Sequence, residues 1–256
     1  MWVNDVELAV ILPVCVLFFG VAFLYSSVGH GGASGYLAIL SFFSFAPREM
    51  ATTALLLNIF VAGISLIAYA RAGHFSARLT LPFLLGSIPF AFVGGMVQIS
   101  SSIYTLLLAV ALFSAAFRLL MQFERSSGID KEKTPPLLIA VPCGAVIGFL
   151  SGVVGVGGGI FLSPLILLTG WADVKRTSAA AAFFIVMNSI AGILGRGIQG
   201  NFSLGTFFPF MIAAFIGGLF GSMWGAKKVS NLGLRRLLAV VLLVAAAKLI
   251  IVAVKS

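Results

Sequence analysis

The sequence predicts an all-α polytopic membrane protein made of two inverted repeats, each with about five helical segments. Of its 256 residues, 61% are hydrophobic and 9% are charged, whereas about a quarter of a soluble globular chain is charged. The mean hydropathy is +1.16. Several apolar runs approach the ~20 residues that cross about 30 Å of hydrocarbon as a helix. These runs are continuous rather than alternating, which favours helices over a β-barrel.

Ten apolar segments follow one another along the chain, five in each half. Those of the first half are residues 8–28, 33–46, 50–70, 79–99 and 101–121, and those of the second are 135–154, 159–170, 177–194, 204–225 and 233–254. No basic stretch precedes the first run, so we expect a mature span rather than a cleaved signal peptide. The second segment of each half reaches only about 18–21 Å at 1.5 Å per residue. We therefore expect the first two segments of each half to form a broken or re-entrant hairpin.

The two halves match each other at a nearly constant offset. Residues 28–32 correspond to residues 154–158 at an offset of 126, and later matches at an offset of 127 pair Gly73 with Gly200, Pro82-Phe83 with Pro209-Phe210, and Gly94 with Gly221. The one strongly polar stretch lies between the halves. The sequence thus predicts a first transmembrane repeat at residues 1–121, a linker at 122–134 and a second repeat at 135–256.

The distribution of lysine and arginine favours the hairpins. With hairpins, 12 of the 16 basic residues fall on one side of the membrane, whereas merging each hairpin into a single span gives about 9 to 7. The positive-inside rule then places the linker in the cytoplasm and both termini outside a bacterial cytoplasmic (inner) membrane. The halves begin on opposite sides, so the repeats are inverted, as in many secondary transporters. Arg196, on the outer side, is expected to be an interfacial snorkelling residue rather than a gate.

Each hairpin carries a glycine-rich break immediately before its short segment. Glycine lets a ligand approach the main chain closely, and the free N–H groups at a helix start attract anions. We expect the two breaks to form one anion site together with two asparagines placed inside spans. The candidate residues are Gly29, His30, Gly31, Gly32, Ala33, Ser34, Gly155, Gly157, Gly158, Gly159, Asn58 and Asn188. The alternatives are tight helix crossings for the glycines and helix–helix hydrogen bonds for the asparagines.

The acidic residues bear on the sign of the ligand. All seven lie near predicted segment ends or in the linker, so no carboxylate is placed where cation carriers usually keep one. His30 is the only ionisable side chain inside a break, which makes it the candidate for proton coupling. The alternative is a neutral histidine hydrogen-bonded to a nearby carbonyl. Its counterpart Val156 cannot titrate, so the site is expected to be asymmetric.

Several of these segments resemble the TauE/SafE sulfite exporter family over essentially the whole chain. They are Gly29–Gly32, Gly155–Gly159 with the following Pro164, the Ala-Thr-Thr-Ala run at 51–54 and the Arg-Ala-Gly-His-Phe run at 71–75. The resemblance implies transport of a sulfur-containing or related organic anion, such as sulfite, sulfoacetate or a similar organosulfonate, or thiosulfate. Ala33 departs from the fuller glycine pattern of the second half.

The leading hypothesis is a secondary anion transporter that works by alternating access, and the alternative is an anion channel. An intramembrane enzyme using Ser26, Ser27 and His30 is disfavoured because nothing supplies an orienting acid. We expect no enzyme activity, no cofactor and no metal. The expected partners are the lipid bilayer and a small anion, without nucleic acid, because the basic residues flank membrane spans; a homodimer is left open.

Overall fold

The computed structural model describes residues 8–42, 46–120, 133–197, 208–227, 242–244 and 246–251. Within these ranges the regular elements are helices: α1 (Leu8–Ser26), α2 (Ala33–Leu40), α3 (Pro47–Arg71), α4 (Ala77–Met96), α5 (Ser101–Leu120), α6 (Leu137–Val154), α7 (Gly159–Leu168), α8 (Val174–Gly197) and α9 (Phe208–Lys227). Five of them, α3, α4, α6, α8 and α9, are long and apolar enough to cross a membrane. The all-α polytopic class is confirmed. The linker lies almost entirely outside the described residues.

The second helix of each half is short, as the sequence predicts. Helix α2 has 8 residues and α7 has 10, which corresponds to about 12–15 Å of helix. Each begins after a glycine in the left-handed region, Gly32 with φ 92° and Gly158 with φ 82°. Other residues rarely adopt this conformation. The left-handed conformation of this glycine ends the preceding turn of the chain and lets the short helix start in a new direction.

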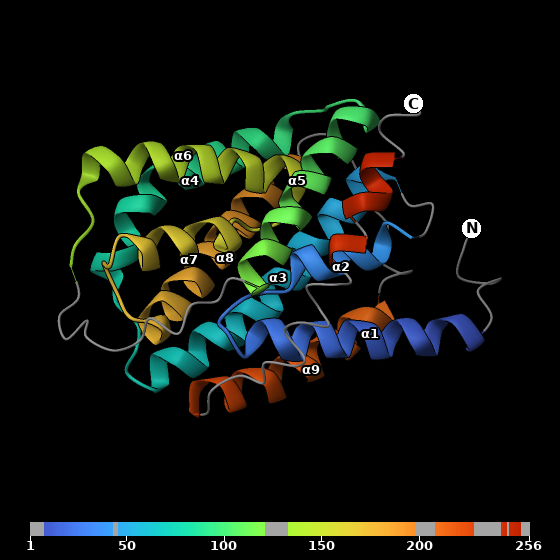
Figure 1. Cartoon of the computed structure of the whole chain (residues 1–256), viewed down its shortest axis with the longest axis horizontal. Helices are drawn as coiled ribbons and strands as arrows, with labels where there is room; N and C mark the ends of the chain where they lie inside the picture. The colour runs from blue at the N-terminus through green and yellow to red at the C-terminus, as the bar shows by residue number, and fades with distance from the viewer. Residues whose placement is uncertain are drawn as a thin grey trace.

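Helices from different halves pack in matched pairs. Helix α1 lies beside α9, and α4 lies beside α6 (Figure 1). A Cβ placed on Gly221 of α9 would overlap the carbonyl oxygen of Phe23 in α1, and a Cβ on Gly94 of α4 would overlap that of Phe149 in α6. These contacts occur at positions related by offsets of 126 and 127. They agree with the proposed duplication and explain why small residues line both crossings.

One of these crossings gives a testable stability difference. A Cβ on Gly148 would overlap the carbonyl oxygen of Ser87, whereas a Cβ on Gly63 would meet nothing within 4 Å. Gly148→Val should destabilise the protein by about 1–3 kcal/mol because the backbones must separate. Gly63→Val should cause little change. The measurement is the thermal unfolding midpoint of the protein in detergent. Equal midpoints for the two variants would contradict the close α4–α6 crossing.

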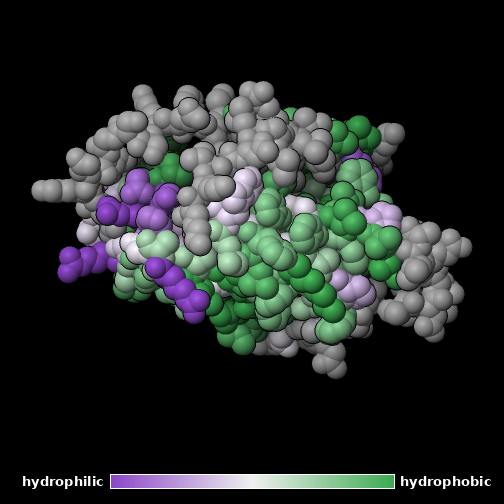
Figure 2. Space-filling model, turned by 90° about the horizontal axis from the view of Figure 1, so that it is seen from below, coloured by the Kyte–Doolittle hydropathy of each residue, from purple (hydrophilic) through white to green (hydrophobic). Residues whose placement is uncertain are grey.

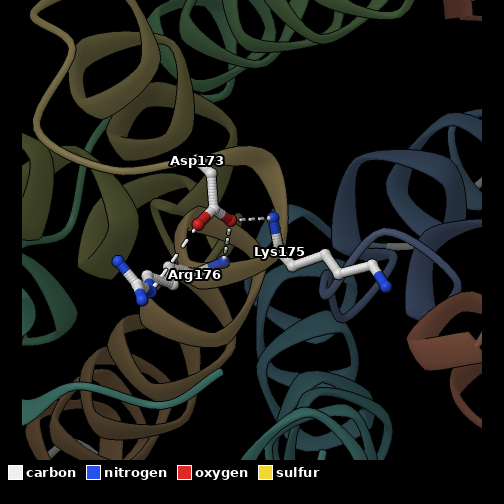
Figure 3. A network of polar contacts seen from close by, with 3 residues as sticks. All are labelled: Asp173, Lys175 and Arg176. Carbon is white, nitrogen blue, oxygen red and sulfur yellow. Dashed lines mark hydrogen bonds and ion pairs between the residues drawn. The ribbon is translucent and has the colours of Figure 1, made fainter. Parts of the chain in front are cut away.

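Basic residues mark both ends of the helix bundle. At one end, called the Arg48 end, Arg48 near the start of α3 donates from Nη2 to the carbonyl oxygen of Arg196 at 2.7 Å, near the end of α8. The two helices therefore run in opposite directions. At the other end, called the Arg176 end, Asp173 caps α8 by accepting from the backbone N–H groups of Lys175 and Arg176, both at 2.9 Å (Figure 3).

The loop between α3 and α4 also lies at the Arg176 end. The pKa of His74 in this loop is lowered, first by burial and then by the positive charge of Lys175, with Arg176 adding to the effect and Asp173 opposing it. At the same end the backbone N–H of Lys133 donates to the carbonyl oxygen of Trp171 at 2.9 Å. Residues that the sequence places on the linker side of the membrane are thus grouped together.

The surface between the ends is largely apolar. Leu12, Val16, Leu138 and Phe220 are 67%, 63%, 88% and 59% exposed. Viewed from below, hydrophobic residues cover most of the described surface, and hydrophilic ones gather toward one end (Figure 2). Apolar area of this extent is typical of a surface that faces lipid.

Candidate functional site

The two glycine breaks meet at Asn58, close to the midpoint of α3. Asn58 is fully buried. A Cβ on Gly31, in the first break, would overlap its Oδ1, and a Cβ on Gly157, in the second, would lie 2.5 Å from its Nδ2. That Nδ2 also donates to the carbonyl oxygen of Val156 at 3.3 Å. One polar side chain is therefore held between the two breaks, and only glycine leaves room for it on both sides.

Four buried polar atoms near the middle of α3 and α8 have no hydrogen-bond partner in the described part of the chain. They are Asn58 Oδ1, both amide atoms of Asn188 and the Ser189 hydroxyl. Ser189 lies next to the second break, since a Cβ on Gly157 would be 3.4 Å from its Oγ. An unpaired buried polar group costs about 1–3 kcal/mol. Groups left in this state near a break are suited to receive a polar ligand.

His30 links the first break to the second. Its Nδ1 lies 2.9 Å from the carbonyl oxygen of Val28, and its Nε2 lies 3.2 Å from that of Gly159 and 3.1 Å from Ser163 Oγ. Ser163 Oγ is also 2.8 Å from the Gly159 carbonyl oxygen. The two breaks are therefore asymmetric, as predicted, because the His30 imidazole extends from the first break to the start of α7.

This geometry can accommodate two protonation states of His30. A carbonyl can only accept, so Nδ1 carries a proton and donates to Val28. In the neutral ring, Nε2 can accept from the Ser163 hydroxyl. In the charged ring, Nε2 can donate to the Gly159 carbonyl oxygen or to Ser163 Oγ, while the Ser163 hydroxyl turns to Gly159. Rotation of one hydroxyl keeps the groups hydrogen-bonded in both states.

The other residues predicted for the site pack against neighbouring helices. Gly29 packs against Ser178, and Gly155 against Ala51, so each break reaches the start of the third helix of the other half. The side chain of Ser34 is directed toward α1, because its hydroxyl shares a 2.6 Å hydrogen bond with that of Tyr25. Of the other predicted residues, Gly32 packs against Tyr36, Gly158 against Phe184 and Gly159 against Ile185, and Ala33 and Ser34 are buried.

The breaks begin where α1 and α6 end, and each of those ends is capped by a matched residue. The Tyr69 hydroxyl donates to the carbonyl oxygen of Ser27 at 2.8 Å. Arg196 Nη2 donates to those of Gly152 at 2.6 Å and Val153 at 2.8 Å. Tyr69 and Arg196 are 127 residues apart, and Ser27 and Val153 are 126 apart, so the two caps occupy equivalent positions. The snorkelling prediction for Arg196 is wrong, because the residue is only 6% exposed.

Sequence reasoning did not identify two residues of this region, Ser163 and Tyr104. Tyr104 donates to the carbonyl oxygen of Val154 at 3.3 Å and so completes the cap of α6. Each lies in an apolar helix, where one hydroxyl gives no distinctive pattern. Their roles follow from contacts between segments far apart in the sequence.

Comparison with known proteins agrees with this architecture. The family described as "Sulfite exporter TauE/SafE" matches residues 14–249. The probable membrane transporter protein y4hK of Sinorhizobium fredii is 37% identical over 242 residues, which cover 93% of this chain and 98% of that protein. The probable membrane transporter protein YunE of Bacillus subtilis is 24% identical over 88% of this chain and 92% of its own.

A plant protein shares a shorter region. Sulfite exporter TauE/SafE family protein 1 of Arabidopsis thaliana is 29% identical over 111 residues, covering 43% of this chain and 24% of that protein. No solved structure matches the chain. Because the family match spans most of the sequence and the rhizobial relative is similar over nearly its whole length, the chain belongs to the TauE/SafE sulfite exporter family of membrane transporters.

Proposed function

We propose that this chain is a secondary transporter that moves a small sulfur-containing or organic anion across the cytoplasmic membrane by alternating access. The candidate substrates are sulfite, sulfoacetate or a similar organosulfonate, and thiosulfate. The observation that carries the proposal is the meeting of both glycine breaks at Asn58, halfway along a membrane-spanning helix. A substrate site near the midplane between two repeats is typical of secondary transporters.

Among the described residues, none of the contacts that form the proposed anion site comes from a buried lysine or arginine. Helices α2 and α7 both begin at the breaks, so their first-turn N–H groups and positive helix ends are available to negative oxygen atoms. The Asn58 amide adds a side-chain donor. A charged side chain at the membrane centre costs at least about 2.5–3.5 kcal/mol, and oriented backbone dipoles avoid most of that cost.

The shared contact with Asn58 supports the proposed alternating access. Gly31 and Gly157 touch opposite atoms of one amide. Movement of one repeat away from Asn58 opens the site toward one side of the membrane, while the other break keeps it closed. The matched α1–α9 and α4–α6 crossings give the two repeats equivalent surfaces on which to rock.

The geometry does not support the intramembrane-enzyme hypothesis. The Ser26 and Ser27 hydroxyls donate to the carbonyl oxygens of Phe23 and Leu24 at 3.3 and 2.7 Å. The serine that does contact His30 is Ser163, but Nδ1 of the same ring faces a backbone carbonyl rather than a carboxylate. A hydrolytic serine–histidine pair normally needs such an orienting acid.

Counterflow in proteoliposomes tests the proposal. Vesicles preloaded with sulfite, isethionate or thiosulfate should take up the labelled anion saturably, and carboxylates serve as the comparison. Uptake into preloaded vesicles only, with a finite half-saturating concentration, is expected of a carrier. Unitary currents in a planar bilayer without counterflow would instead identify a channel. Neither flux nor current for any sulfur anion would overturn the proposed substrate class.

A further inference from the structure

A cavity of about 240 Å³ opens at the Arg48 end of the bundle, away from Asn58. It lies where α3 and α5 begin and where α4 and α8 end. Its polar lining consists of Arg48, Gln98, Ser101, Tyr104 and Arg196. This volume accommodates an anion of a few heavy atoms.

The lining is strongly positive. Two arginines contribute to it, and none of the described residues that line it is acidic. Glu49, beside Arg48 in the sequence, is exposed and does not line the cavity. The first turns of α3 and α5 also border it, and they add the partial positive charge of two helix starts. Because the cations are partly shielded from water, they attract an anion more strongly than surface arginines do.

Capping of α6 does not by itself explain why an arginine lines this cavity at position 196. Its Nη2 binds two carbonyl oxygens at the end of α6, while its Nε is buried and has no partner among the described residues. At the equivalent position of the other half, Tyr69 caps α1 as a neutral residue. A hydroxyl is therefore sufficient for the cap. Burying a cation is costly, so the charge at position 196 calls for a further role.

We infer that this cavity is a second anion-binding site, which holds the sulfonate or sulfite-like anion at the Arg48 end on its way to or from Asn58. The inference rests on the proposed transport function for the identity of the ligand. The charge and the shape of the cavity do not depend on the proposed transport function. The equivalent cap at the Arg176 end carries no charge, so the pathway is electrostatically asymmetric.

The cavity can be probed through a single cysteine placed at Ser101, an exposed residue of its lining. The two natural cysteines, Cys15 and Cys143, are replaced by alanine, and Ser101→Cys is added. The purified protein is then treated with 2-sulfonatoethyl methanethiosulfonate, which is itself an organosulfonate anion, and with its trimethylammonium counterpart. The ratio of the anionic to the cationic reaction rate reports the local potential.

In the Arg48→Gln variant this ratio should fall by about tenfold, because one positive charge near the thiol is removed. Arg48→Lys keeps the charge and should hold the ratio within about twofold. Isethionate should slow labelling by at least about threefold when arginine is present at position 48, and not in Arg48→Gln. Arg196→Lys keeps the positive charge at position 196, so it should also retain the ratio of anionic to cationic labelling rates.

These outcomes separate the two proposals, since labelling requires no transport. A ratio that is unchanged in Arg48→Gln would overturn the second site even if counterflow is normal. A ratio that falls without protection by isethionate would show a local field but no binding site, and would also overturn it. Charge-dependent labelling with isethionate protection, in a protein that shows no counterflow, would support the cavity site and contradict the proposed transport function.

Discussion

Asn58→Leu is expected to reduce counterflow of the transported anion by about 100-fold while leaving the stability of the protein nearly unchanged. Leucine has almost the shape of asparagine but cannot donate to an anion, and a hydrogen bond to a charged group contributes about 1.5–3 kcal/mol. The substitution also removes Oδ1, which is buried without a partner. That gain offsets the lost bond to the Val156 carbonyl oxygen.

The matched control is Ser87→Ala in α4. The Ser87 hydroxyl is also buried without a partner among the described residues, but it belongs to the α4–α6 crossing rather than to a break. Ser87→Ala should leave counterflow and the thermal midpoint close to wild type. Wild-type affinity and rate in Asn58→Leu would remove Asn58 from the site. Loss of the folded protein in Asn58→Leu alone would show that the residue is structural.

The short second helix of each half and the glycine break before it could be predicted from local pattern and repetition. The segments at 33–46 and 159–170 are too short to cross a membrane, and the glycines before them recur at one offset. Both features depend on chain geometry rather than on tertiary contacts. The predicted segment begins at residue 177, whereas α8 begins at Val174, because the Asp173 cap outweighs the polar character of Lys175 and Arg176.

The contacts that complete the site could not be predicted in the same way. Asn58 has no polar counterpart, since Phe184 and Ile185 stand at the repeat offsets, so symmetry does not reveal that it lies between the breaks. Arg196 is at a helix end, where arginine usually snorkels to the interface. Its burial depends on the carbonyl oxygens of Gly152 and Val153 in another helix. Ser163 reaches His30 across 133 residues of sequence.

His30→Gln is expected to abolish the pH dependence of anion affinity. A protonated imidazole adds positive charge beside the second break, so the anion should bind more tightly at low pH. The half-saturating concentration should rise by about tenfold from acidic to alkaline pH, which corresponds to about 1.4 kcal/mol. Isethionate is the suitable substrate, because its sulfonate stays charged throughout, so any change in affinity comes from the protein.

His74 provides the matched control, as the only other histidine in the sequence. It lies in the loop at the Arg176 end, where burial and Lys175 lower its pKa. Because His74 lies in this loop rather than in a break, His74→Gln should leave the pH profile of affinity intact. Ser163→Ala removes the rotating hydroxyl next to Nε2 of His30 and should alter the pH profile of affinity. An unchanged profile in His30→Gln would rule out proton coupling through this residue and leave it as a bridge between the breaks.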